Sequence, residues 1–285
     1  MIRSLLAAGL IAFSATTTLA AEKIRFAVTD LNGLEQLQQE FKPFQDALED
    51  ITGLEVELFP ISSRTAAVEA MNSDMLDLVL TGPAEYVVMK ELADARVVTA
   101  WQRTDYYSEI VVMANGPINK VEDLKGQRVS FASAGSTSQH LGPAQALADL
   151  GLTVNEDYEG VFISRNVATE ALIRGDIAAV SMTRTYLRQA RELYPDEAFS
   201  VVVRSGDLPN DVLVASRDLD DETFETVRSA FIEHGGELMA AVLNGGKDNE
   251  KFVGGSFITN IDDSEYNYVR SMYETVGIPF DNFTN

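Results

Sequence analysis

The residues best suited to chemistry form the segment 133–140, which runs Ser-Ala-Gly-Ser-Thr-Ser-Gln-His. A short β-type run, 129–132, precedes it, and apolar residues at helical spacing follow it over 141–150. This pattern predicts a strand that leads directly into a helix. Unpaired backbone N–H groups and the positive end of the helix dipole meet at such a junction, so an anion can bind there without a charged side chain.

The segment has more polar side chains than the start of a helix requires. Hydroxyls at Ser136, Thr137 and Ser138 are followed by the imidazole of His140, whereas one side chain is enough to cap a helix. Gly135 lets the backbone approach a ligand closely. Because each oxygen of a tetrahedral oxyanion accepts several hydrogen bonds, we interpret the segment as an oxyanion site. A capped helix without a ligand is the alternative interpretation.

A second polar junction lies at 80–86, Leu-Thr-Gly-Pro-Ala-Glu-Tyr, again between a predicted strand and a predicted helix. Pro83 suits the first turn of that helix, although a simple turn would also explain the Gly-Pro pair. Thr29 and Asp30, directly after the first predicted strand, 23–28, are a third group of polar residues at a strand end. Ligands of open α/β sheets bind at the carboxyl ends of strands. The candidates from these two places are Thr29, Asp30, Thr81, Gly82 and Tyr86.

Strands and helices alternate along the chain. The first part predicts strands over 23–28, 54–59 and 76–80 and helices over 34–51, 65–73 and 84–92. After Tyr107 the pattern predicts strands over 110–114, 129–132, 161–164 and 178–182, with helices near 121–124 and over 141–150, 169–174 and 185–193. Strands over 200–203 and 212–215 precede a mainly helical part that begins at Asp218.

This order predicts an α/β protein with two lobes, each a mostly parallel sheet flanked by helices. Short crossings near 105–110 and 205–211 would make the second lobe an insertion within the first. The lobes are expected at 22–108 plus 208–285 and at 109–207. Such lobes close on a ligand by hinge motion, so the site is expected in the cleft between them.

The first twenty residues resemble a secretory signal peptide in composition. Arg3 supplies the positive charge, 5–13 is an apolar core too short to span a bilayer, and Thr-Leu-Ala at 18–20 suits cleavage. A signal peptide is therefore expected at 1–20, with Ala21 or Glu22 starting the mature chain. No later stretch reaches the roughly 18 apolar residues of a spanning helix, so we expect an exported, soluble protein without direct membrane insertion.

Composition excludes several classes of protein. The chain has no cysteine, which removes disulfides and thiol chemistry. Its formal net charge of −22 argues against nucleic acid or an anionic membrane as a partner, since no basic patch can displace counterions. The same charge repels an anionic ligand, so local donors must overcome the field of the whole molecule.

Few residues could support catalysis. The chain has two histidines and lacks the nucleophile-elbow, zinc-protease and phosphate-loop motifs. Acidic pairs such as Asp220-Asp221 and Asp262-Asp263 show no calcium-loop spacing and are better explained as solvated surface. We therefore expect no metal, no cofactor and no enzymatic activity.

Several motifs together resemble a known family. They are Arg64-x-x-Ala67-Val-Glu-Ala-Met71, Asp77-Leu-Val-Leu-Thr-Gly-Pro-Ala-Glu-Tyr86, Tyr106-Tyr-Ser-Glu-Ile-Val-Val112, Val121-Glu-Asp-Leu-Lys-Gly126, Ser136-Thr-Ser138 and Leu208-Pro-Asn-Asp211. In this order they are similar to the phosphate-, phosphite- and phosphonate-binding proteins of ABC importers, the PhnD family, over nearly the whole mature chain.

The resemblance implies a type II periplasmic-binding-protein fold and a periplasmic protein that delivers a phosphorus oxyanion to a membrane permease without catalysis. Ser136, Thr137 and Ser138 would hold the oxygens from the second lobe, and Tyr106 would close over the ligand at the hinge. We expect a monomer.

Two arginines depart from the family pattern. Arg64 stands where the family commonly has Tyr, and Arg165 follows Ile-Ser where the family often has Gly-Ser-His. Ala178 also stands where the family usually has an acidic residue. Arginines facing the cleft would supply bidentate donors where a phosphonate amine would need carboxylates. We therefore predict an inorganic oxyanion rather than an aminoalkylphosphonate, unless one or both arginines lie on the surface.

The sequence leaves other functions open. The same fold could present its ligand to a sensor kinase instead of a permease. A periplasmic enzyme acting on a phosphorylated metabolite would need a positioned base or metal, and a purely structural protein would not need three polar strand ends. Phosphate, phosphite, methylphosphonate, arsenate and sulfate differ by a proton or one substituent, so the ligand stays open.

Overall fold

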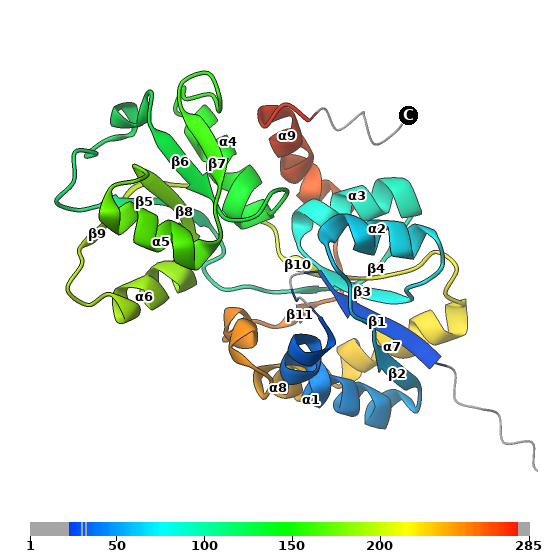
Figure 1. Ribbon diagram of the computed structural model, residues 1–285. Coiled ribbons are helices and arrows are strands. Elements are labelled where there is room, and N and C mark those ends of the chain that lie inside the picture. Colours follow the sequence, from blue (N-terminus) through cyan, green and yellow to red (C-terminus); the bar gives the residue numbers. More distant parts are fainter. Residues whose placement is uncertain (1–22, 30, 32, 279–285) are drawn as a thin grey trace, which may run out of the picture.

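The computed structural model describes residues 23–29, 31 and 33–278, which form two α/β lobes (Figure 1). The predicted signal peptide, 1–20, and the candidate Asp30 lie outside the described residues. Within that range, no helix combines the length and the apolar character needed to cross a membrane.

The first lobe is built on a sheet of six strands in the order β11-β4-β10-β3-β1-β2. Its strands are β1 (Lys23–Val28), β2 (Glu55–Leu58), β3 (Leu78–Thr81), β4 (Arg96–Trp101), β10 (Asp211–Ala215) and β11 (Phe257–Ile258). β1 pairs in parallel with β2 and β3, and β10 pairs antiparallel with both β3 and β4. β1 to β4 therefore share one direction, which confirms a mostly parallel sheet.

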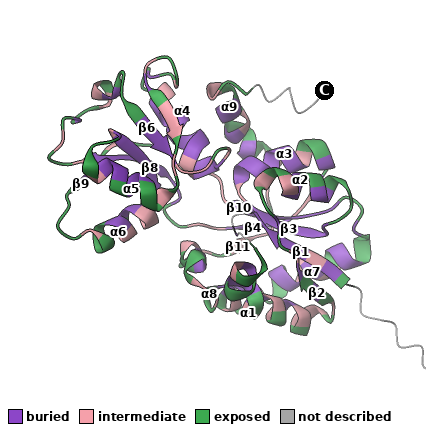
Figure 2. Ribbon diagram, in the orientation of Figure 1, coloured by how far each residue is buried: buried purple, intermediate pink, exposed green. Residues whose placement is uncertain are grey.

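Helices cover both faces of this sheet (Figure 1). One face carries α1 (Leu34–Thr52), α7 (Asp221–Glu233) and α8 (Gly235–Leu243), and the other carries α2 (Arg64–Asn72), α3 (Pro83–Ala93) and α9 (Asn267–Thr275). The 3₁₀ helices η3 (Lys247–Phe252) and η4 (Asp263–Tyr266) also belong to this lobe, whereas η1 (Val121–Leu124) packs in the core of the second lobe. Buried residues follow the sheet and the helix faces turned to it (Figure 2).

The second lobe repeats the plan with five strands in the order β7-β6-β8-β5-β9. These are β5 (Ser108–Met113), β6 (Arg128–Phe131), β7 (Glu159–Phe162), β8 (Ala179–Thr183) and β9 (Phe199–Arg204). α5 (Arg165–Arg174) and α6 (Arg184–Leu193) pack on one face, and η2 (Thr137–Leu141) and α4 (Gly142–Ala148) belong to the other side. In each sheet, one strand is antiparallel to both of its neighbours: β10 in the first and β5 in the second.

Two crossings join the lobes, 102–107 between β4 and β5 and 205–210 between β9 and β10. They are bonded to each other: the Leu208 amide donates to the Tyr106 carbonyl at 2.8 Å, and the Ser205 amide donates to the Ser108 carbonyl at 2.9 Å. α9 adds a third link, because it packs against both α3 and α4. We propose the lobe limits 22–108 plus 208–285 and 109–207 on the basis of these crossings.

The sequence pattern omitted two strands of the first sheet, β4 and the two-residue β11. β4 (Arg96–Trp101) lies where the alternation was expected to pause before Tyr107. Its residues are β-branched or aromatic in part, but the strand follows α3 after a tight turn in which Asp94 has a φ of 49°. A short strand next to a helix end has no flanking Gly or Pro to mark it.

Candidate functional site

A small polar pocket lies between the lobes, and we call it the inner pocket. It encloses about 20 Å³ and is lined by Arg64, Gly82, Arg103, Tyr106, Ser136, Thr137, Ser138, Gln139, Tyr186, Asp211 and Lys251. A wider hollow of about 440 Å³, the outer pocket, shares four of these residues and adds Arg165, Ser133, Ser164 and Asp248 among others. Both lobes and a crossing contribute to the inner pocket, so its shape depends on how the lobes meet.

The second lobe contributes the hydroxyl-rich turn predicted from the sequence. Ser136 precedes a π-helical turn, η2, in which the amides of both His140 and Leu141 donate to the Ser136 carbonyl at 3.0 Å. Such single π turns are frequent at functional sites. Gly142 permits the turn, because a Cβ there would lie 2.8 Å from the Thr137 carbonyl oxygen. The helix expected after the hydroxyl segment thus begins with a π turn at Thr137 and continues as α4.

This turn contacts the other lobe directly. The Ala84 amide, in the first turn of α3, donates to Thr137 Oγ1 at 2.9 Å. Ser108 Oγ donates to the Ser138 carbonyl and Ser181 Oγ donates to the Gln139 carbonyl, each at 2.7 Å. These bonds fix the turn with the Thr137 hydroxyl at the N-terminus of α3, where the dipole favours negative charge.

Charged side chains surround these donors. Asp211 is buried between Arg103, at 3.3 Å, and Lys251, at 3.8 Å. Arg64 forms an ion pair with the buried Glu85. Three cations and two carboxylates therefore meet at the pocket, in a chain whose formal net charge is −22. The low dielectric of a buried site strengthens this local attraction relative to distant surface charges.

The structure brings together six of the predicted residues in the inner pocket: Arg64, Gly82, Tyr106, Ser136, Thr137 and Ser138. Arg165 lies in the outer pocket, with its guanidinium 3.1 Å from the centre of the Tyr186 ring. Tyr106 stacks under the guanidinium of Arg103 at 3.6 Å.

Three predicted residues lie in buried contacts away from the inner pocket. The hydroxyls of Thr29 and Thr81 are hydrogen-bonded to each other at 3.1 Å across neighbouring strands. The Tyr86 hydroxyl donates to Asp263 at 2.7 Å, and its ring packs on Tyr266. Burial raises the pKa of the Tyr86 phenol, which suits a neutral donor within the core. These side chains hold the strand ends and α3 in place.

His140 supports the hydroxyl turn from behind. The Gly135 amide donates to His140 Nδ1 at 3.1 Å, and the ring packs edge-on against Phe131 and Phe162. Burial lowers the pKa of His140 from 6.5 to about 4. The imidazole is therefore neutral at pH 7, accepting a hydrogen bond that shapes the loop before Ser136.

The His140 environment predicts a pH dependence of stability. In the unfolded chain the imidazole binds a proton near pH 6.5, but in the folded protein only near pH 4. The contribution of neutral His140 to the free energy of unfolding is therefore complete above pH 6.5. It is lost as the pH falls towards 4, by up to about 3 kcal/mol. Urea unfolding at pH 7.5, 6 and 5 should show that the free energy of unfolding falls more steeply with decreasing pH in wild type than in His140→Asn. The exposed His234→Asn should follow wild type; equal slopes in all three proteins would contradict this prediction.

Sequence reasoning missed five residues of the inner pocket: Arg103, Gln139, Tyr186, Asp211 and Lys251. Gln139 and Asp211 fell within quoted motifs, which was the available signal. Arg103 and Lys251 belong to a crossing and to η3, where no local pattern marks a ligand-facing cation.

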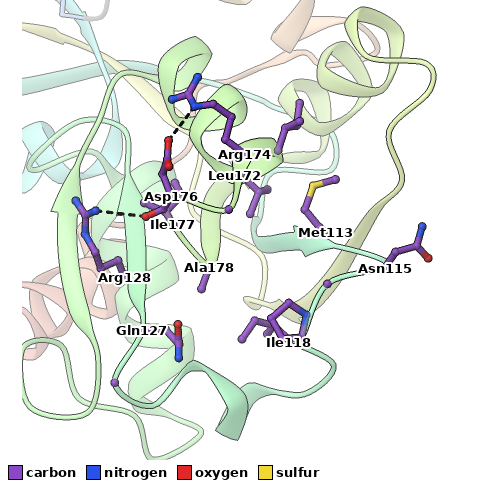
Figure 3. Close-up of a pocket in the computed structure, with 15 residues that line it drawn as sticks. Met113, Asn115, Ile118, Gln127, Arg128, Leu172, Arg174, Asp176, Ile177 and Ala178 are labelled. Carbon is purple, nitrogen blue, oxygen red and sulfur yellow. Dashed lines mark hydrogen bonds and ion pairs between the residues drawn. The ribbon is translucent and has the colours of Figure 1, made fainter.

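A larger cavity of about 550 Å³ lies in the second lobe, beside the start of β6 and the end of α5 (Figure 3). Its two arginines are already paired: Arg174 contacts Asp176 at 2.8 Å, and Arg128 donates to the Asp176 carbonyl at 3.3 Å. It lies on a single lobe and gathers none of the polar strand-end residues. The inner pocket is therefore the better candidate for an anion.

The described residues contain no cluster of three or more His, Cys, Asp or Glu side chains that could hold a metal ion. The donors of the inner pocket are hydroxyls, amides, guanidinium groups and an ammonium group, together with the buried carboxylates. This set suits an oxyanion better than a cation.

Two α/β lobes joined by paired crossings, with a polar pocket between them, define a type II periplasmic binding protein. Residues 26–266 match the family of periplasmic substrate-binding proteins of phosphonate ABC transporters, and the chain belongs to that family. This confirms the resemblance seen in the motifs.

Similar proteins include a phosphate-import protein PhnD from Mycolicibacterium smegmatis, 30% identical over 139 residues, which cover 46% of this chain and 43% of that protein. The match thus spans less than half of that relative. A binding component of a phosphonate ABC transporter from Pseudomonas aeruginosa has a similar structure, with 17% identity, a TM-score of 0.70 and coverage of 93% of this chain and 90% of that one. PhnD1 from Prochlorococcus marinus in complex with methylphosphonate has 18% identity, a TM-score of 0.70 and coverage of 90% and 98%.

Proposed function

We propose that this protein is the periplasmic substrate-binding component of an ABC importer for a phosphorus oxyanion: phosphate, phosphite or a small phosphonate. The observation that carries the proposal is the inner pocket, where three hydroxyl residues of one lobe meet the N-terminus of α3 and three cations. Family membership supports the same role, with a membrane permease as partner, a periplasmic location after export, and binding without catalysis.

The proposed binding set combines two kinds of donor. Ser136, Thr137 and Ser138 supply hydroxyls and amides, and Arg64, Arg103 and Lys251 supply positive charge. Gly82 and Tyr106 complete the wall, with Arg165 at the outer pocket. Because the inner pocket is small, a ligand of a few heavy atoms fits this set when the lobes separate and close again about the paired crossings.

The preference for an inorganic anion over an aminoalkylphosphonate loses part of its basis in the structure. Arg64 is paired with Glu85, and Asp211 adds a second buried carboxylate. The positive charges in the inner pocket are therefore opposed by buried carboxylates, and a small phosphonate stays within the proposed ligand class.

A thermal-shift and calorimetry screen of the mature protein tests the proposal. Phosphate, phosphite and methylphosphonate are the probes, since a ligand that binds only the folded state stabilises it by about 2.7 kcal/mol at one hundred times Kd. We expect at least one of them to raise Tm and to bind with 1:1 stoichiometry. A protein whose Tm responds to none of the three at millimolar concentration would contradict the proposed function.

A further inference from the structure

Glu85 is a buried carboxylate at the edge of the inner pocket whose role in a site for anions needs explanation. It occupies the first turn of α3 and is 4% exposed. One carboxylate oxygen, Oε1, is in an ion pair with Arg64. The other, Oε2, is also buried and accepts no hydrogen bond from the part of the chain that the structure describes.

The open oxygen is next to the proposed ligand-binding residues. A Cβ built on Gly82 would lie 2.9 Å from Glu85 Oε2 and 3.7 Å from Thr137 Oγ1. Gly82 and Thr137 both line the inner pocket, so Oε2 borders the same space as the hydroxyl turn. Any side chain at position 82 would collide with this oxygen.

A carboxylate oxygen in this position can only accept a hydrogen bond. Leaving it buried without a donor is costly, and facing it with a fully deprotonated anion adds charge repulsion. A hydroxyl on the bound anion removes both costs through a short, charge-assisted O–H···O⁻ bond. The other oxygens of the anion remain available to the hydroxyls and cations of the pocket.

We infer that Glu85 is a specificity-determining residue that selects oxyanions carrying a proton, by accepting a hydrogen bond from the P–OH group. The inference rests on the proposed function. Phosphate and the monoanions of phosphite and of alkylphosphonates have such a hydroxyl near neutral pH, whereas sulfate and sulfonates have none. Since phosphate and sulfate are alike in size and shape, the proton is the feature that separates them.

The first experiment uses the wild-type protein. Calorimetry at pH 7 compares phosphate with sulfate and methylphosphonate with methanesulfonate. A site with a buried acceptor disfavours a ligand that lacks the donor by large factors, so we expect the phosphorus member of each pair to bind at least about 100-fold more tightly. Sulfate binding within about threefold of phosphate would overturn the inference. Failure of every phosphorus oxyanion to bind would instead overturn the proposed function.

The second experiment replaces Glu85 by Gln, whose amide can donate to a sulfate oxygen. In Glu85→Gln the ratio of phosphate to sulfate affinity should fall by about 10-fold or more. Glu40→Gln is the matched control: Glu40 is also 4% exposed with an unpartnered Oε2, but it lies on α1 beside Gly245 and Gly246. Its selectivity should equal that of wild type. An unchanged ratio in a folded Glu85→Gln protein would overturn the inference.

An ammonium group on the ligand is the competing donor for Oε2. Wild-type affinities for 2-aminoethylphosphonate and methylphosphonate separate the two cases. Similar affinities support selection of the P–OH proton, because both ligands carry it. A preference of 100-fold or more for the amine that disappears in Glu85→Gln would show that Glu85 recognises the ammonium instead. The wild-type comparisons decide the inference even if Glu85→Gln does not fold.

Discussion

Replacing Thr137 by Val is expected to weaken binding of the phosphorus oxyanion by about 100-fold. Valine keeps the shape of threonine but removes the hydroxyl that accepts the Ala84 amide at 2.9 Å and faces the inner pocket. The buried amide then lacks its partner and the anion loses a donor, at about 1–3 kcal/mol each. Calorimetry with phosphate and methylphosphonate measures the loss.

Thr137→Ser is the matched control, because it retains the hydroxyl and removes a methyl group. We expect it to bind within about tenfold of wild type, since only packing is lost. Solution scattering with and without ligand would also show whether Thr137→Val closes less completely. Wild-type affinity in Thr137→Val would exclude the hydroxyl from binding and from the contact between the lobes.

The second large effect concerns stability. Trp101→Ala should lower the free energy of unfolding by about 3–5 kcal/mol, measured by guanidinium titration. Trp101 is fully buried at the end of β4, and its ring contacts five phenylalanines: Phe41, Phe44, Phe231, Phe252 and Phe257. Its backbone is in register with Asp211, so loss of this cluster also loosens a carboxylate of the inner pocket.

Trp101→Phe separates packing from polarity. The indole Nε1 has no hydrogen-bond partner among the described residues, so phenylalanine loses volume and no polar contact. A cost of about 1 kcal/mol is expected. Equal destabilisation by Ala and Phe would contradict stabilisation of β4 by aromatic packing.

The sequence predicted the fold well because its signals are local. β1 was expected over 23–28 and is found at Lys23–Val28, and α3 starts at Pro83 as the Gly-Pro pair indicated. Hydrophobic periodicity and helix-start residues act within one or two turns, so they can be read without knowing the partners of a segment. β4 was missed because its boundaries depend on pairing with β10 and β11.

The candidate site was only half predictable, and Tyr86 and Arg64 show why. Tyr86 was chosen from a strand-to-helix junction and Arg64 as a departure from the family pattern. Tyr86 turns into the core towards Asp263, while Arg64 faces the pocket and pairs with Glu85. Arg64 begins α2 and Tyr86 lies in the first turn of α3. Which of these side chains faces the pocket depends on how the two helices pack on each other and on the first sheet.

By itself the sequence determined the alternating lobes, the family and the hydroxyl turn at 136–138, because short-range patterning and a contiguous motif carry that information. Only the tertiary structure decided the charged half of the site. It placed Arg103 and Lys251 beside Asp211 and left one oxygen of Glu85 at the pocket edge. These groups come from segments far apart in the chain, and their charges act on a common ligand only once folding has removed the water between them.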